Sequence, residues 1–397
     1  MSDSARGHSA DLNEQVSAAR RRLGESITAA ARLTPERVMV WGQFADAPAR
    51  ALQTGIYGTS AAVAVLASRS RDMTSTVRLL PGVTKPSAAE FDVSDLLITH
   101  KASAIVGALG AAHYDLTRDT EAYRCLLAGV IDGQGWGHHA VPGEPEAPSA
   151  LATAQALIAL ASVHDVDETS LAGPASWLVS RILDDGSLSI LELSFSVIAL
   201  ARLQGMGIGV ESADAMRHGA TVLRNWFRRE QSKLIAYEEV HYWVPKPGEQ
   251  RNHHVTFPVQ VITGIALLLS GSAVKARTHL DGLARRLCRA VETDGGLRSS
   301  LTERVGIVDI GLVDQFFVEY LALESSSGPR RRAVFRVMRA GRTHRVVVFL
   351  GLVTVAFWSW RVATGESGAM SVSFIANVAF ALATGVLGSM AYSRWER

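Results

Sequence analysis

The sequence is poor in cysteine and in lysine. Its two cysteines, Cys125 and Cys288, lie far apart and form neither a disulfide framework nor the close pairs of a zinc site. Only five of the 40 basic residues are lysine, and the formal net charge is +2, so the composition gives no general case for binding nucleic acid. The first 30 residues lack the apolar run of a secretory signal, and we expect no cleaved signal peptide.

Charge is also missing from two long runs near the C-terminus. Residues 346–360 hold no charged side chain, and neither do residues 369–392. At about 1.5 Å per residue, the second run exceeds the roughly 30 Å hydrocarbon layer of a bilayer. The first run is shorter, but Arg345 and Arg361 can snorkel to lengthen it. These runs predict a transmembrane helical hairpin over residues 346–392. The alternative is a helical hairpin buried in a globular core.

Arginines set the expected orientation of this hairpin. Seven of them lie between residues 330 and 345, none lies in the polar turn at residues 364–368, and Arg394 and Arg397 follow the second run. The positive-inside rule therefore predicts a multi-pass protein of the inner (cytoplasmic) membrane, with its N-terminal domain and its C-terminus in the cytoplasm. The basic segment 328–345 either lies along anionic headgroups or is a solvated flank of the first span.

Most of the remaining sequence alternates between apolar helical segments and sharp breaks. In residues 176–203 an apolar run meets DDGS and a second apolar run follows at once, which predicts two antiparallel helices joined by a tight loop. Asp-Gly pairs recur at 132/133, 185/186 and 294/295. The second interval is about twice the first, so a further repeat unit is expected near residue 239. The only period-2 run, at 255–259, is too short to indicate a sheet.

These repeats resemble those of terpenoid cyclases and protein prenyltransferase β-subunits, in which six helix pairs close into an (α/α)6 toroid. The matching residues are Trp177 with Asp185–Gly186–Ser187, Asp132–Gly133 with Gly135–Trp136–Gly137, and Asp294–Gly295–Gly296. The glutamine of the strict family repeat is absent before Asp185. The resemblance implies an all-α fold, an (α/α)6 toroid of about six helix pairs followed by a two-helix transmembrane hairpin. The expected domains are an N-terminal helical segment (1–50), the toroid (51–327), the basic segment (328–345), the hairpin (346–392) and a cytoplasmic tail (393–397).

The catalytic motifs of that superfamily are not found. The Asp-x-Asp-Asp run of alkene-protonating cyclases is missing, since residues 91–97 offer only Asp92 and Asp95. No magnesium-binding Asp-Asp-x-x-Asp cluster is present, because Asp184 and Asp185 are adjacent but position 188 is leucine. The two cysteines sit in helical contexts that do not fit the zinc site of a prenyltransferase. We therefore expect no metal and no cofactor.

Polar residues that could line the mouth of a toroid gather in two places, around residues 136–139 and residues 238–254. The expected ligand-binding residues are Trp136, His138, Tyr242 and Trp243, and the candidate catalytic residues are His241, His253, Asp309 and Glu192. Histidine can act as a base or neutralise charge, as in α/α-toroid polysaccharide lyases. The alternatives are that the histidines pack in loops and that the carboxylates cap helices or face the rim.

Two classes of function fit this sequence. One is a non-catalytic, membrane-anchored toroid that binds a hydrophobic, isoprenoid-like or lipid-like ligand or a protein partner, such as a bacterial membrane effector or sensor. The other is a membrane-tethered enzyme related to terpene cyclases, prenyltransferases or polysaccharide lyases. The missing motifs favour the first class. The expected partners are the lipid bilayer, through residues 346–392, a hydrophobic small molecule, and a second copy of the chain through the transmembrane hairpin; nucleic acid is not expected.

Overall fold

The computed structural model describes residues 3–34, 37–46, 55–80, 98–115, 117–138, 147–164, 166–184, 188–208, 211–230, 235–246, 249–299 and 302–326. This part of the chain is mostly helical, which confirms the all-α fold class. The predictions for 328–345, 346–392 and 393–397 lie outside the described residues. Among the helices that are described, none has both the length and the apolar character needed to cross a bilayer.

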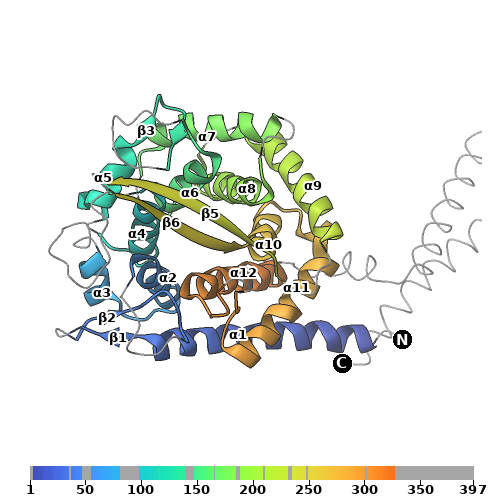
Figure 1. Ribbon diagram of the computed structural model, residues 1–397. Coiled ribbons are helices and arrows are strands. Elements are labelled where there is room, and N and C mark those ends of the chain that lie inside the picture. Colours follow the sequence, from blue (N-terminus) through green and yellow to red (C-terminus); the bar gives the residue numbers. More distant parts are fainter. Residues whose placement is uncertain are drawn as a thin grey trace, which may run out of the picture. The chain divides into compact units, whose positions relative to one another are not determined.

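Twelve α-helices are present in the described residues, and they alternate between two positions (Figure 1). The odd-numbered or outer helices are α1 (Asp3–Ala30), α3 (Thr74–Leu79), α5 (Glu121–Ala128), α7 (Glu168–Leu183), α9 (Ala213–Arg229) and α11 (Ala273–Asp294). The even-numbered or inner helices are α2 (Ile56–Ala67), α4 (Thr99–Ala111), α6 (Ala150–Leu160), α8 (Ile190–Gly205), α10 (Val259–Leu269) and α12 (Ile307–Ser326). A 3-10 turn, η2 (Thr117–Asp119), precedes α5.

The inner helices follow one another side by side. Helix α4 packs between α2 and α6, and α8 packs between α6 and α10. Phe316 of α12 lies against Gly264 of α10, and Gly311 of α12 lies against Ala61 of α2. The last inner helix thus returns to the first, and the outer helix α11 packs on α1. Figure 1 shows the inner helices around a common centre, with the outer helices around them.

The two helix types differ in sequence because they have different neighbours. Inner helices meet protein on several sides, and ten of the eleven residues of α10 are buried. Outer helices bury one face and expose the other, as in α9 and α11, where arginines alternate with buried alanine and leucine. The alternating apolar segments of the sequence therefore correspond to successive inner helices. The apolar runs of the sequence at residues 54–67, 96–111, 148–161, 188–203, 258–269 and 305–323 predict helices, and these are present as α2, α4, α6, α8, α10 and α12.

The breaks between helices carry specific caps. Ser189 begins α8 with a capping box, in which its hydroxyl accepts the Glu192 N–H at 3.2 Å and its own N–H donates to the Glu192 carboxylate at 2.8 Å. Asp184 ends α7, and residues 185–187 lie outside the described part. Helix α11 ends at Gly295, whose φ of 74° is left-handed and favours glycine.

Two of the outer-to-inner connections have the same internal bonds. The indole N–H of Trp41 donates to the Ile27 carbonyl at 2.7 Å, and that of Trp136 donates to the Leu126 carbonyl at 2.5 Å. The hydroxyls of Thr59 and Thr153 accept the backbone N–H of these tryptophans at 3.1 and 2.9 Å. Both tryptophans are fully buried, so each ties its loop to the outer helix before it and the inner helix after it.

Three two-stranded sheets lie in such connections. Short pairs join β1 (Arg32–Leu33) to β2 (Met39–Val40) and β3 (Val130–Ile131) to β4 (Gly135–Trp136). The third pair is an antiparallel hairpin of two ten-residue strands, β5 (Tyr237–Lys246) and β6 (Glu249–Pro258). The expectation that no sheet forms near residues 255–259 was therefore wrong. The hairpin occupies the connection from α9 to α10, where the repeat spacing predicted a unit near residue 239.

Helices from the two ends of the described region meet at a buried carboxylate. Asp314 of α12 accepts a bond from Arg69 after α2 at 2.5 Å and from Arg20 of α1 at 3.2 Å. Arg69 also donates to the Arg20 carbonyl at 2.5 Å. Burial raises the pKa of Asp314 and the two guanidiniums oppose this. This cluster fixes α12 between the first outer and first inner helices.

Candidate functional site

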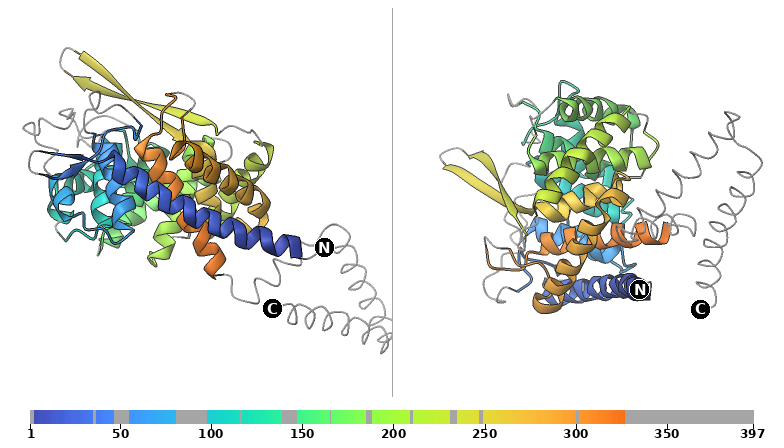
Figure 2. Two further views of the ribbon diagram at one scale, coloured as in Figure 1. Left: turned by 90° about the horizontal axis from the view of Figure 1, so that it is seen from below. Right: turned by 90° about the vertical axis from the view of Figure 1, so that its right-hand side faces the viewer.

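The β5–β6 hairpin crosses the end of the inner helices at which their N-termini gather. In Figure 1 it passes in front of the inner helices, and in Figure 2 it stands off that face. Val240 and Val255 pack on Ile98, the N-cap residue of α4. Glu238 lies beside Ser189 and Glu192 at the start of α8, and burial raises its pKa. We call this end of the inner helices the mouth.

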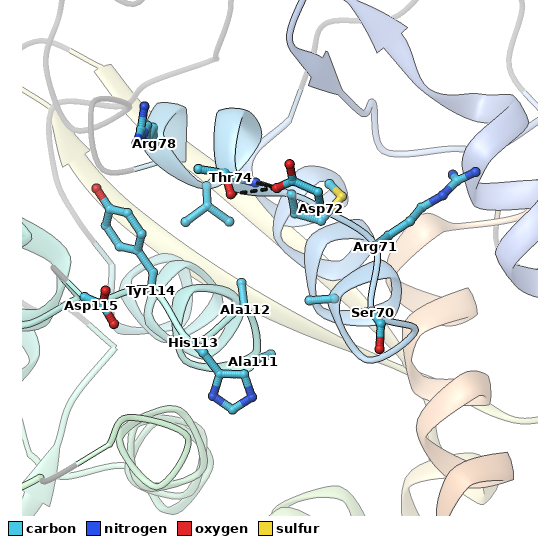
Figure 3. Close-up of a pocket in the computed structure, with 13 residues that line it drawn as sticks. Ser70, Arg71, Asp72, Thr74, Arg78, Ala111, Ala112, His113, Tyr114 and Asp115 are labelled. Atoms are coloured by element: carbon cyan, nitrogen blue, oxygen red, sulfur yellow. Dashed lines mark hydrogen bonds between the residues drawn. The ribbon is translucent and has the colours of Figure 1, made fainter.

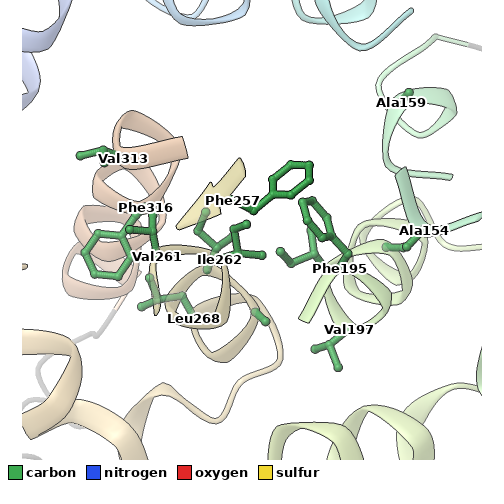
Figure 4. Packing of buried hydrophobic residues seen from close by; sticks show 14 of the residues in the cluster. Ala154, Ala159, Phe195, Val197, Phe257, Val261, Ile262, Leu268, Val313 and Phe316 are labelled. Atoms are coloured by element: carbon green, nitrogen blue, oxygen red, sulfur yellow. The ribbon is translucent and has the colours of Figure 1, made fainter. Parts of the chain in front are cut away.

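A cluster of four aromatic side chains fills part of the mouth. Phe257, near the end of β6, meets Phe195 of α8 edge to face at 5.5 Å between ring centroids, and His100 of α4 at 5.7 Å. Figure 4 shows Phe257 and Phe195 pointing toward one another between α10 and α8. Tyr57 of α2 lies 4.7 Å from His100. Residues from α2, α4, α8 and the hairpin thus converge, and we call Tyr57, His100, Phe195 and Phe257 the mouth cluster.

His100 is held as a neutral ring. Its Nδ1 lies 3.0 Å from Oε1 of Gln155 on α6, so Nδ1 carries the hydrogen and donates it. Loss of water around the ring lowers the pKa of His100 to about 4, and the charges of His138 and Lys101 lower it further, against the opposing effect of the Gln155 bond. At neutral pH the mouth cluster is therefore uncharged, with Tyr57 and His100 partly exposed and the two phenylalanines buried.

An acid and a phenol form a second group beside the mouth cluster. Asp309, in the first turn of α12, is 5% exposed, and its Oδ2 lies 3.5 Å from the hydroxyl of Tyr237 at the start of β5. Burial raises the pKa of Asp309 to about 7, and the Tyr237 bond opposes the shift. Burial and the Asp309 charge raise the pKa of Tyr237 well above its usual range. A carboxyl with this pKa can gain or lose a proton near neutral pH, whereas the phenol stays protonated there.

Below the mouth, the inner faces of three neighbouring helices keep partial exposure and carry mostly small side chains. His100 faces the centre, and residues four, seven and eleven positions later share its side of α4. The partly exposed positions of α4, α2 and α12 on these stripes are Ala104, Gly107 and Ala111, then Ala61 and Ala64, then Gly311, Leu312 and Gln315. At the far end of the inner helices, Arg202 of α8 bonds Glu319 of α12 at 2.6 Å.

A separate pocket of about 550 Å³ lies at the C-terminal ends of α2 and α4 and at the start of α3 (Figure 3). Arg71, Arg78, His113 and Tyr114 are among its lining residues. Its acid Asp72 already accepts two bonds from Thr74, which lower the pKa of that carboxyl. The lining brings together no buried acid and base, so we place the candidate site at the mouth.

The predicted site residues fall in different places. Asp309 lies in the acid–phenol pair. His138 lies in the loop after β4, where its carbonyl accepts the Thr99 N–H at 2.8 Å, and its charge acts on His100. Trp136 is fully buried with its indole bonded to Leu126, so its place is in the packing of α5 and α6. Glu192 caps α8, in agreement with the alternative reading of that carboxylate.

The other predicted residues lie on the hairpin. The register pairs His241 with His254, Tyr242 with His253, and Trp243 with Asn252. Their backbones form the two strands, and their side chains lie outside what the structure describes. Their predicted roles in ligand binding and catalysis stay predictions. Histidines that the sequence placed in an inter-helix loop are thus strand residues.

Sequence reasoning missed Tyr57, Phe195, Tyr237 and Phe257. Each is a lone aromatic residue in an apolar or mixed segment, and only the fold brings them together. The sequence does contain one indication of the two tryptophan loops: the Trp-Gly pair at 41/42 recurs at 136/137. Nothing in the described residues groups three or more histidine, cysteine or carboxylate side chains as a metal would need. Comparisons with family models, curated proteins and solved structures find no match.

Proposed function

We propose that the described helices form an (α/α)6 toroid like that of terpenoid cyclases and prenyltransferase β-subunits. The support is the alternation of outer and inner helices, the return of α12 to α2, and the repeated tryptophan loops. We further propose that residues 346–392 anchor the toroid to the cytoplasmic face of the inner membrane. Two uncharged runs flanked by arginine support that anchor.

The function we propose is binding of a hydrophobic, isoprenoid-like or lipid-like molecule inside the toroid, without catalysis. One observation carries this proposal: partly exposed alanine and glycine stripes on α2, α4 and α12 lead up to an aromatic cluster at the mouth. Small side chains leave room for a ligand, and apolar walls with a few convergent polar groups are typical of small-molecule sites. A ligand drawn from the bilayer would also explain a toroid tethered to it.

The test is native mass spectrometry of the full chain purified from membranes. We expect a bound apolar molecule that is released on unfolding. Ala104→Trp fills the stripe on α4 and should abolish the bound mass, whereas Ala172→Trp, on the exposed face of α7, should not. The proposal fails if no bound molecule is found, or if Ala104→Trp retains it while the variant remains folded.

The acid–phenol pair favours catalysis as a second candidate function. A carboxyl with a pKa of about 7 suits general acid–base work near neutrality. It is a poor acid for protonating an alkene, which needs a much stronger one, so this pair does not support cyclase chemistry of that kind. Asp309→Asn separates the two functions: it should leave ligand binding intact if the toroid only binds, and should lead to accumulation of unconverted ligand if Asp309 reacts.

A further inference from the structure

Five arginines without a carboxylate partner in the described part of the chain lie on two neighbouring outer helices, α9 and α11. Arg224, Arg228, Arg229, Arg285 and Arg289 make no ion pair with any carboxylate that the structure describes. Elsewhere arginines on α1, α8 and the loop after α2 are paired with Asp314 or Glu319. An unpaired arginine in water is ordinary, but five on two neighbouring helices add positive charge to one side of the molecule.

The two helices bring these arginines onto one side of the molecule. Helix α9 packs on α11, and Phe227 meets His279 edge to face at 6.3 Å. Burial lowers the pKa of His279, and the charge of Arg228 lowers it further, which places that guanidinium near α11. Figure 1 shows α9 and α11 side by side on the right-hand side. We call the outer surface of these two helices, defined by the five arginines, the basic face.

The basic face is a local exception to the charge of its domain. Ten of the 40 basic residues and two of the 38 acidic residues follow residue 326, so residues 1–326 hold 30 basic and 36 acidic side chains. The acidic residues of both helices are already paired: Asp214 of α9 with Arg217, and Asp281, Glu292 and Asp294 of α11 with Arg277, Arg22 and Arg298. A net-negative domain with one positive face is repelled by an anionic surface in most orientations and attracted in one.

Apolar side chains of α9 and α11 are also exposed, and those of α9 lie on the same side of the helix as Arg229. Val222 is 37% exposed, and Trp226 follows it by one helical turn and is partly exposed. Val274, at the start of α11, is 38% exposed. Tryptophan with arginine is the combination that the headgroup layer of a membrane favours, because the ring enters the apolar boundary while the guanidinium meets phosphate.

We propose that the basic face lies against the anionic headgroups of the membrane that anchors the chain. This inference rests on the anchor proposed above and adds an orientation for the toroid. Residues 327–345 separate the described helices from the first apolar run, and 19 residues reach at most about 65 Å, so the domain stays within reach of the headgroups. The attraction depends on anionic lipid and weakens with salt.

The experiment places a fluorescent probe on the full chain in nanodiscs that contain a headgroup-labelled quencher lipid. Cys125 is first replaced by serine; Cys288 is buried. Thr221→Cys carries the probe on the exposed side of α9, and Ser75→Cys carries it on α3 (Figure 1). With phosphatidylglycerol in the disc, we expect quenching at position 221 to exceed that at position 75 at least threefold. The difference should vanish in discs of phosphatidylcholine alone.

Charge variants identify the basic face as the cause. Arg228→Gln with Arg229→Gln should bring the quenching at position 221 down to that at position 75. The matched control, Arg118→Gln with Arg124→Gln on the α5 side, removes the same charge and should change nothing. Equal quenching at both positions in every lipid overturns the inference and leaves ligand binding untouched. A chain that does not enter nanodiscs contradicts the anchor and the inference together.

Discussion

The backbone N–H of Ile307 donates to the carbonyl of Gln43 at 2.9 Å. The same bond joins the Thr99 N–H to the His138 carbonyl at 2.8 Å. In both cases the acceptor lies two residues after a buried Trp, and the donor begins an inner helix. The first bond joins residues from opposite ends of the described chain, whereas the second joins neighbouring helix pairs. The same kind of backbone hydrogen bond therefore joins the two ends of the described region and two neighbouring helix pairs inside it.

This equivalence predicts equal responses at the two tryptophan loops. Thr59→Val and Thr153→Val each leave the buried N–H of a tryptophan without its acceptor, at a cost of about 1–3 kcal/mol. Urea unfolding of the two variants should give losses that agree within about 1 kcal/mol. A loss at Thr153 with none at Thr59 would contradict the equivalence, because it would mean that the first loop is dispensable.

Gly58 should tolerate no side chain. A Cβ there would lie 1.8 Å from the carbonyl oxygen of Gly42, in the loop that carries Trp41, so Gly58→Ala must displace backbone. We expect a loss of at least about 2 kcal/mol, in the range of overpacked cores. Gly55→Ala is the matched control, since nothing lies within 4 Å of the Cβ it adds. Thermal unfolding of both variants checks the prediction. Equal melting temperatures would contradict the close approach of the Gly42 carbonyl to Gly58.

Asp314 should matter far more than an exposed ion pair between the same parts of the chain. Asp314→Ala leaves two arginines without their buried partner, and we expect a loss of about 3–5 kcal/mol. Glu292→Gln breaks the exposed pair of α11 with Arg22 and should cost less than about 1 kcal/mol. Chemical denaturation measures both, and similar losses for the two variants would argue against closure at Asp314.

The Asp309 carboxyl predicts how stability depends on pH. Because burial raises its pKa to about 7, above the value in the unfolded chain, the ionised form destabilises the fold. This penalty is absent below about pH 4, grows as the pH rises, and is complete above pH 7, where it reaches roughly 4 kcal/mol at most. Asp309→Asn should therefore be more stable than the wild type at pH 8, and this gain should disappear at pH 4. A gain that does not change with pH would exclude ionisation as its cause.

His100 predicts the opposite slope over an overlapping range. Its pKa falls to about 4 in the folded chain, so its neutral form contributes stability that is complete above about pH 6.5 and is lost as the pH falls toward 4. The contribution is roughly 3 kcal/mol at most. His100→Gln should remove this part of the acid sensitivity. Nitrogen chemical shifts of the His100 ring at pH 5.5 give an independent check, since a charged ring at that pH would refute the neutral state.

The sequence predicted the inner helices well because each is a largely apolar segment between polar breaks, and left-handed glycines, Gly207 and Gly271, follow α8 and α10. Ser189 and Glu192 illustrate this, since the cap lies within four residues of the break it explains. The repeat spacing also located the connection near residue 239. Closely spaced residues determine such features, so a local reading is sufficient.

The hairpin and the mouth could not be predicted in this way. Strand β5 mixes charged, aromatic and proline residues without clear alternation, and only its pairing with β6 makes it a strand. Asp309 stood out as a carboxylate among apolar neighbours, but its partner Tyr237 lies 72 residues earlier in the chain. Phe257 and His100 are farther apart still, and their contact depends on how the hairpin and the inner helices pack together.

The bond from Ile307 to Gln43 also has a consequence for synthesis. A growing chain makes α1 and the first tryptophan loop at once, yet their final neighbours emerge more than 250 residues later. The surfaces of α1 and of the first tryptophan loop that contact α11 and α12 therefore stay exposed until α12 has left the ribosome. The contacts of α12 with α2 and of α11 with α1 then join the last helices of the described region to the first. Joining the ends of the described region and cutting it at another connection should then give a protein with the same helix contacts and a different first residue.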